Sequence, residues 1–112
     1  MRIVIRVSMI AAVFAVAAAR PAMAQDVEKG KAVYAAQKCS VCHGIAGVGS
    51  KNLPLDGVGT KLSAADIRAW IVTPKEMETK TKSVKKPPMP DKYAKLPAAD
   101  LDALVAYMAS LK

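Results

Sequence analysis

Hydrophobic residues near the end of the chain recur every three or four positions, which is the spacing of one face of an α-helix. The pattern predicts a helix from about Ala98 to Leu111, with Asp100 and Asp102 placed favourably near its positive N-terminal end. Pro97 stands where a capping Ser or Thr would be expected, and proline is acceptable in a first helical turn. The buried stripe of this helix is predicted to comprise Leu101, Leu104, Val105, Met108 and Leu111.

A second helix is predicted earlier in the chain. Asp26 can cap a helix that runs from about Val27 to Lys38. Gly30 is unusual in its interior, because glycine inside a helix costs about 1 kcal/mol relative to alanine. We interpret Gly30 as the point where another helix crosses so closely that no side chain fits. The residues at helical spacing here are Val27, Gly30, Val33 and Tyr34.

The middle of the chain predicts a third helix. Ser63-Ala64-Ala65-Asp66 is a variant of the capping box, and Ile67, Trp70 and Ile71 then share one face until Pro74 stops the helix. No segment shows the two-residue alternation of a half-buried strand, and no repeat or low-complexity tract is present. The fold class is therefore predicted as one all-α domain, with three main helices joined by long loops.

The N-terminus has the features of an export signal. Two arginines are followed by an apolar run from Val7 to Ala19, and Ala22-Met23-Ala24 is a small-x-small cleavage site. Residues 1–24 are therefore predicted to be a secretory signal peptide, cleaved after Ala24, that leaves residues 25–112 as the domain. Arg20-Pro21 ends the apolar run well short of the ~20 residues that span a bilayer. Stable membrane insertion is not expected, and export in a bacterium would place the domain in the periplasm.

The predicted domain is small and has few large side chains. Losing three arginines with the signal peptide lowers the formal net charge from +8 to +5 and leaves 88 residues. A domain of this size is only marginally stable if it relies on the burial of its own side chains. A bound hydrophobic group is therefore expected to complete its core. Without that group the chain is expected to fold poorly. Its aromatic residues are Tyr34, Trp70, Tyr93 and Tyr107.

The motif that carries the chemistry is Cys39-Ser40-Val41-Cys42-His43, because C-x-x-C-H is the attachment sequence of a c-type haem. Cys39 and Cys42 can each add across one vinyl group of a haem and hold the ring by two thioether bonds. His43 then lies under the iron as the proximal nitrogen ligand. The sequence predicts one covalently bound haem c.

Three other interpretations of the cysteine pair are less consistent with the chain. A thioredoxin-like C-x-x-C follows a strand and precedes a helix, whereas here a helical stretch precedes it and a glycine-rich loop follows. A structural zinc site needs four ligands, and the sequence holds two cysteines and one histidine. A plain disulfide is usual in exported proteins, but the only histidine falls directly after the second cysteine.

The order of these features resembles that of a small class I cytochrome c over nearly all of residues 26–112. The resemblance implies that Gly30 and Tyr34 lie where the first helix crosses the last, with Leu104 and Tyr107 as their partners. It also implies that the carbonyl of Pro54 accepts the Nδ1 proton of the haem histidine. In the same family a tryptophan packs beside the haem and bonds a propionate, and Trp70 corresponds to it, although Trp70 also suits the core of the middle helix.

The sixth iron ligand is predicted to be Met89. It lies in Pro87-Pro88-Met89-Pro90, a rigid extended segment just before the last helix, where the family carries its ligand methionine. Met77 stands between two glutamates, which suggests exposure to solvent, and Met108 belongs to the buried stripe. Met/His ligation leaves no open iron position, so electron transfer is favoured over oxygen binding, peroxide chemistry or any enzymatic activity.

Charge indicates the partner. Lysines outnumber acidic residues between positions 75 and 95, and this stretch is the basic segment. It flanks the predicted iron ligand, so its positive charge would steer an acidic redox partner to the haem edge. Nucleic acid is a poor alternative, because the chain is expected to be exported and its lysines have a single aromatic, Tyr93, among them for stacking. A monomeric electron shuttle is predicted; the alternatives are a tightly bound haem subunit of a larger periplasmic oxidoreductase and a ligand-binding haem protein. The lysines of the basic segment are Lys75, Lys80, Lys82, Lys85, Lys86, Lys92 and Lys95.

Overall fold

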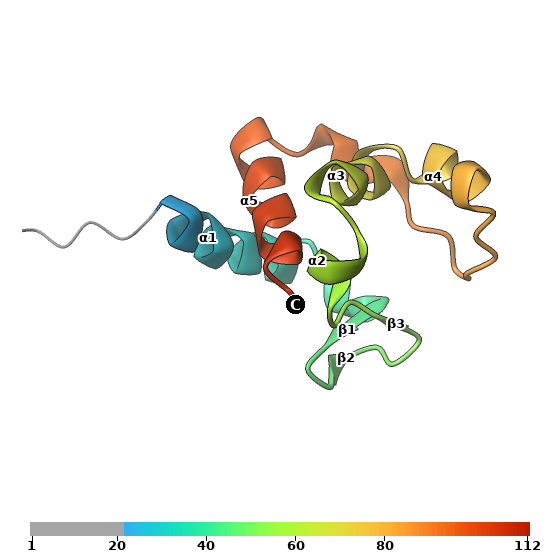
Figure 1. Cartoon of the computed structure of the whole chain (residues 1–112), viewed down its shortest axis with the longest axis horizontal. Coiled ribbons are helices and arrows are strands. Elements are labelled where there is room, and N and C mark those ends of the chain that lie inside the picture. The colour runs from blue at the N-terminus through green and yellow to red at the C-terminus, as the bar shows by residue number, and fades with distance from the viewer. Residues whose placement is uncertain (1–21) are drawn as a thin grey trace, which may run out of the picture.

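The computed structural model describes residues 22–112, so most of the predicted signal peptide lies outside the described residues. Five α-helices, two 3₁₀-helices and three very short strands make up this part of the chain (Figure 1). The elements are α1 (Ala22–Ala36), η1 (Cys39–Val41), β1 (His43–Ile45), β2 (Val48–Gly49), β3 (Leu53–Pro54), α2 (Val58–Lys61), α3 (Ala64–Val72), α4 (Pro74–Thr81), η2 (Asp91–Lys95) and α5 (Ala98–Ala109).

The first and last helices cross at Gly30, as the sequence predicted (Figure 1). A Cβ atom placed on Gly30 would collide with the carbonyl oxygen of Ala103 and lie 2.5 Å from the Cβ of Tyr107. One turn further along α1, the Tyr34 ring meets the Tyr107 ring edge to face, with centroids 5.8 Å apart. Tyr107 is therefore confirmed as a partner, while Ala103 occupies the place at Gly30 that was expected for Leu104.

The ends of these two helices agree only in part with the prediction. Helix α1 begins at Ala22 rather than at Val27, so Asp26 lies inside the helix and does not cap it. Helix α5 begins at Ala98 with Pro97 in the N-cap position, and no side chain caps it. The predicted stripe of α5 is buried at Leu104, Val105 and Met108 and partly exposed at its two end positions, Leu101 and Leu111.

The third predicted helix is present, but a further helix follows it. The Ser63 hydroxyl accepts a hydrogen bond from the Asp66 amide at 3.1 Å, which caps α3 as expected. Helix α3 ends at Val72, and Pro74 then begins α4 instead of leading into a loop, because proline is favoured in the first turn of a helix. The prediction that Met77 faces solvent was wrong, since α4 buries it to 6% exposure.

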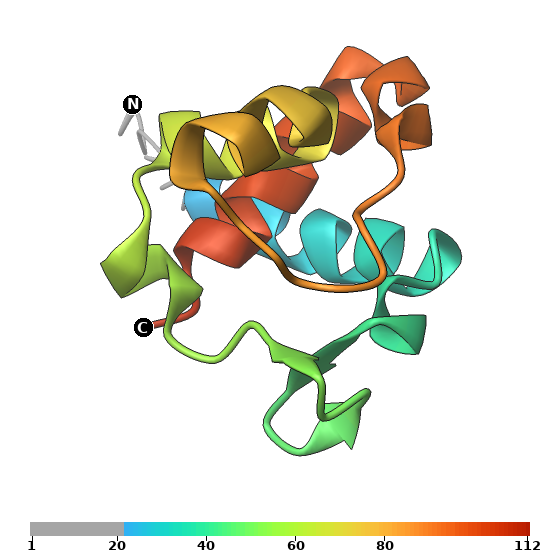
Figure 2. The same cartoon turned by 90° about the vertical axis from the view of Figure 1, so that its right-hand side faces the viewer.

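A small three-stranded sheet was also missed by the sequence prediction. Strand β1 lies in its centre, antiparallel to β2 and parallel to β3. Each strand has two or three residues, too few for an alternating pattern to be recognised. The sheet lies to one side of the helices and carries the histidine of the C-x-x-C-H motif (Figures 1 and 2).

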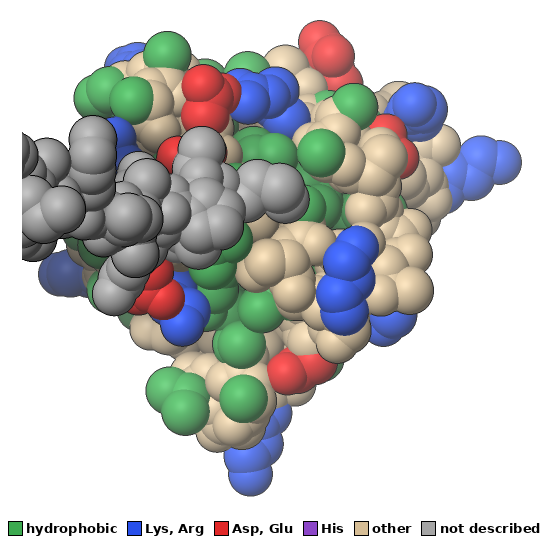
Figure 3. Space-filling view, turned by 60° about the vertical axis from the view of Figure 1, so that its left-hand side comes forward, with side chains coloured by type: hydrophobic (Ala, Val, Ile, Leu, Met, Phe, Trp, Pro, Cys, Tyr) green, Lys and Arg blue, Asp and Glu red, His purple; other side chains and the backbone are tan. Residues whose placement is uncertain are grey.

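Two ion pairs join α5 to its neighbours. The Lys29 ammonium lies 3.4 Å from the Asp100 carboxylate, and the Arg68 guanidinium pairs with Asp102. Exposed pairs of this kind contribute about 0–1 kcal/mol each, so they orient the helices more than they stabilise them. On the face seen in Figure 3, basic and acidic side chains are interspersed.

The hydrophobic core lies where α1, α3, η2 and α5 meet. None of the helices described over residues 22–112 is both long enough and apolar enough to cross a membrane. The core keeps one open side, which is the pocket described next. The buried residues of the hydrophobic core are Val33, Ile67, Ile71, Tyr93, Leu104, Val105, Tyr107 and Met108.

Candidate haem site

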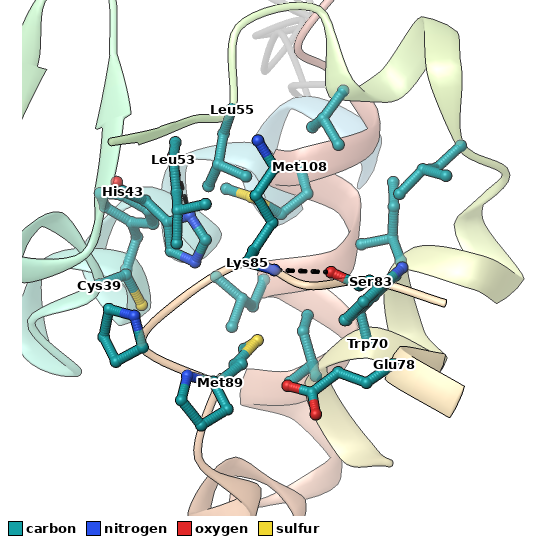
Figure 4. A pocket seen from close by; sticks show the side chains of 18 residues that line it. Cys39, His43, Leu53, Leu55, Trp70, Glu78, Ser83, Lys85, Met89 and Met108 are labelled. Atoms are coloured by element: carbon teal, nitrogen blue, oxygen red, sulfur yellow. Dashed lines mark hydrogen bonds between the residues drawn. The ribbon is translucent and has the colours of Figure 1, made fainter. Parts of the chain in front are cut away.

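An apolar pocket beside the core brings together most of the residues predicted to bind a haem (Figure 4). Cys39, His43, Trp70 and Met89 all line it, although they come from four different segments of the chain. Cys42 and Pro54 are not among the lining residues. The structure therefore gathers Cys39, His43, Trp70 and Met89 around one cavity.

The C-x-x-C-H motif forms a tight turn at the mouth of this pocket. Helix α1 ends, Lys38 adopts a left-handed conformation with φ of 57°, and η1 follows as a single 3₁₀ turn. The Cys42 amide donates to the Cys39 carbonyl at 3.2 Å. Both cysteines are half-buried, and burial raises the pKa of the Cys39 thiol above its ordinary value.

The imidazole of His43 is oriented by one hydrogen bond. Its Nδ1 lies 3.0 Å from the carbonyl oxygen of Leu53, ten residues along the chain. A carbonyl can only accept, so Nδ1 carries a proton, and Nε2 is the ring nitrogen that remains available to bind a metal. A bond of this type fixes the ring orientation and raises the basicity of the ligand nitrogen. The prediction that the Pro54 carbonyl accepts this proton was wrong, because the acceptor is the carbonyl of the preceding residue, Leu53.

Pro54 still explains why the Leu53 carbonyl points at His43. A proline disfavours the helical conformation for the residue before it and pushes that residue into an extended one. Leu53 is accordingly the first residue of β3. Leu53 and Leu55 line the pocket while Pro54 is exposed, as alternation along an extended chain requires. Sequence reasoning selected Pro54 and thus missed its neighbour Leu53, which supplies the acceptor.

Two methionines, Met89 and Met108, line the pocket. Met89 comes from the extended segment between α4 and η2, and its sulfur points into the cavity (Figure 4). Met108 comes from the buried face of α5 and belongs to the hydrophobic core. Met77, although buried, is not a lining residue. The pocket therefore leaves Met89 and Met108 as the sulfur atoms to consider for an iron.

Polar groups gather at the end of the pocket away from the cysteines (Figure 4). Trp70, Glu78 and Ser83 line this end, and Lys85, whose amide donates to the Ser83 hydroxyl at 3.4 Å, lies nearer the middle of the pocket. Sequence reasoning singled out Trp70 alone among them as a pocket residue. The others lie on α4 or directly after it, and their place in the pocket depends on a helix that the sequence pattern did not reveal.

Tyr34 carries a polar atom that the protein leaves without a partner. Its hydroxyl is buried beside the pocket and makes no hydrogen bond within the described residues. Burial is the main cause that raises the pKa of Tyr34 to about 12, with a smaller contribution from Cys39. Burial likewise raises the pKa of Tyr93. Both phenols are therefore neutral at physiological pH.

These features fit the chemistry of a haem. A haem is flat and apolar, has its two vinyl groups toward one edge and carries two carboxylates toward another. The pocket has the Cys39 thiol and the His43 ring at one end, polar side chains at the other, and apolar walls between them. An open apolar surface is costly in water, and a large flat hydrophobic group would cover it. The wall residues are Leu53, Leu55, Val58, Leu62, Ile67, Ile71 and Leu104.

Comparison with known protein families gives the same result. A family model described as Cytochrome c matches residues 27–112, which includes every residue that lines the pocket. Searches of curated proteins and of solved structures gave no significant match.

Proposed function

The chain belongs to the cytochrome c family, and we propose that it is an exported electron carrier whose haem iron is held by His43 and Met89. Membership of this family implies covalently bound haem c with iron, and it points to haem-based electron transfer. The observation that carries the finer proposal is that His43 and Met89, from different segments, line one pocket together with Cys39.

Met89 is the better of the two sulfur candidates. Met108 lies within α5, where the helix hydrogen bonds and the surrounding core fix its backbone. Met89 lies in an extended segment and is only partly buried, so its thioether is free to approach an iron. The prolines on either side restrict the segment, which lowers the entropy lost on ligation. A thioether in this role raises the reduction potential.

Two protein ligands would leave no iron position for a substrate. His43 and Met89 hold the metal from the protein side, and the haem supplies the Fe(II)/Fe(III) couple. The apolar pocket walls would exclude water from a haem held there. Electron transfer without substrate chemistry follows from this arrangement.

The basic segment supports a role in docking acidic redox partners. All seven of its lysines are exposed, and Lys85 also lines the pocket. The same stretch supplies the pocket residues Glu78, Ser83 and Met89, so its positive charge borders the cavity. A positive rim around a redox centre speeds encounter with an acidic partner more than it tightens binding.

The proposal includes export, because haem attachment at a C-x-x-C-H motif of this kind takes place outside the cytoplasm. Periplasmic fractionation of cells that express the full chain tests this part. The mature protein should begin at Gln25 on N-terminal sequencing. A retained leader or a cytoplasmic haem protein would contradict it.

Electron transfer is tested with small redox reagents of opposite charge. The holoprotein should be reversibly oxidised and reduced, and the ferrous form should not bind carbon monoxide avidly. Electron transfer to the anion ferricyanide should slow as salt is added, whereas transfer from the cation hexaammineruthenium(II) should accelerate. Avid carbon monoxide binding by the wild type would favour a ligand-binding haem protein instead.

A matched pair of charge reversals locates the docking surface. The double variant Lys85→Glu/Lys86→Glu should flatten the salt dependence with ferricyanide, because both lysines belong to the segment that borders the pocket. Lys51→Glu, on an exposed loop between β2 and β3, is the control and should change it far less. Equal effects per charge would show that net charge, and not a local rim, governs the encounter.

A further inference from the structure

The sheet around His43 contains a contact that the proposed electron-transfer role does not account for. The carboxylate of Asp56 accepts a hydrogen bond from the amide of Ala46 at 2.7 Å. Asp56 follows β3, whereas Ala46 is the first residue of the turn between β1 and β2. The contact therefore ties the turn after β1 to the segment after β3.

The turn that receives this contact has a demanding backbone conformation. Ala46 and Gly47 both have positive φ, at 50° and 80°, and they join the paired residues Ile45 and Val48. Two positive φ values in a two-residue hairpin are typical of a type I′ turn. Alanine tolerates this conformation less well than glycine. A charge-assisted hydrogen bond to its amide offsets part of that cost.

The same contact fixes the distance between β1 and β3. Near this end, the Leu55 amide donates to the Gly44 carbonyl at 2.7 Å. The Asp56–Ala46 bond lies just beyond it, one residue after Leu55 and two residues after Gly44, and continues the ladder by means of a side chain. At the other end of the ladder is the bond from His43 Nδ1 to the Leu53 carbonyl, at 3.0 Å.

We propose that Asp56 is a positioning residue for the iron ligand His43. It acts by holding β3 in register against β1, which keeps the Leu53 carbonyl on the Nδ1 proton of His43. Asp56 does not touch the pocket. This inference rests on the proposed function in one respect, namely that His43 ligates the iron.

The consequence is chemical as well as structural. The carbonyl bond raises the basicity of the imidazole, and a more basic ligand stabilises Fe(III) relative to Fe(II). If β3 moves away from β1, this bond lengthens and the imidazole becomes a weaker donor. The reduction potential of the holoprotein should then rise.

The test compares Asp56→Ala with Asp56→Asn in the holoprotein. Both variants remove the charge, but the asparagine side-chain oxygen can still accept the Ala46 amide proton. Asp56→Ala should speed the exchange of the His43 Nδ1 proton with solvent severalfold, as measured by NMR on the reduced protein. It should also raise the midpoint potential more than Asp56→Asn does, and Asp56→Asn should keep Nδ1 proton exchange near that of the wild type.

Two results would overturn the proposal. Equal shifts of potential in both variants, with unchanged exchange of the Nδ1 proton, would show that Asp56 acts through its charge alone. In the wild type, the Ala46 amide should exchange slowly even though Ala46 is exposed, and rapid exchange there would contradict the contact without any variant. If the wild-type spectrum shows no nitrogen ligand from His43, the proposed function fails instead, which is a different outcome.

Discussion

The two walls of the pocket are built in different ways. On the histidine wall, β1 is paired on both sides, the Ser50 amide donates to the His43 carbonyl at 3.0 Å, and the ring itself is bonded to Leu53. On the methionine wall, the chain from Lys85 to Pro90 forms neither helix nor strand, and Met89 is only partly buried. Hydrogen bonds fix the first wall, whereas prolines and packing restrict the second.

This difference indicates which ligand the protein would exchange first. A segment with few backbone hydrogen bonds and few buried contacts opens at a lower free-energy cost than a paired strand. Loss of the Met89 sulfur should therefore precede loss of the His43 nitrogen when the holoprotein is destabilised.

The largest effect is expected from the haem attachment residues of the histidine wall. Replacing both Cys39 and Cys42 by Ser should abolish covalent attachment, because each thiol is predicted to supply one bond to the ring. His43→Ala should weaken haem retention and the stability of the fold, because it removes the proposed nitrogen ligand of the iron. Haem staining of denaturing gels measures attachment. A double serine variant that still carries haem through denaturation would refute the assignment.

An intermediate effect is expected from the methionine wall. Met89→Ala should open the iron, lower the reduction potential, allow cyanide and azide to bind readily, and remove the weak red absorption band of a sulfur ligand on ferric haem. In the wild type, the segment from Lys85 to Pro90, which would carry this ligand, should be the first to open when the protein is destabilised. Optical titration with azide and a redox titration measure these changes.

Two other methionines serve as controls for that experiment. Met108→Ala and Met77→Ala should each cost about 2–5 kcal/mol of stability, because both side chains are buried at 6% exposure. Neither should remove the sulfur band, since Met77 does not line the pocket and Met108 is held within α5. A sulfur band that survives Met89→Ala and disappears in Met108→Ala would transfer the ligand role to α5.

The smallest effect is expected behind both walls, at the helix crossing. Gly30→Val should destabilise the holoprotein by about 1–3 kcal/mol through overpacking against Ala103 and Tyr107. The spectrum and the ligands of the iron should stay unchanged, because Gly30 is not a pocket residue. Thermal melts followed by circular dichroism measure the loss. A melting temperature equal to or above that of the wild type would contradict a close crossing.

Sequence reasoning was accurate where a local signal was sufficient. The capping serine of α3 is recognisable from four consecutive residues, and Gly30 is conspicuous because a glycine inside a helix has a cost that only close packing explains. Sequence reasoning failed for Met77 on α4. Its two glutamate neighbours suggested exposure to solvent, whereas the side chain is buried. The burial of Met77 depends on helix α4, which the sequence pattern did not reveal.

The sequence alone determined the cofactor chemistry, because two thiols and an imidazole within five residues need no long-range structure to meet one haem. Membership of the cytochrome c family and the crossing of the terminal helices follow from the order of such local signals. Only the tertiary structure decided that Leu53, and not Pro54, accepts the proton of His43. That bond joins residues ten positions apart and depends on the register of strands too short to have a period, so it is set by the folded sheet and not by any segment of the chain.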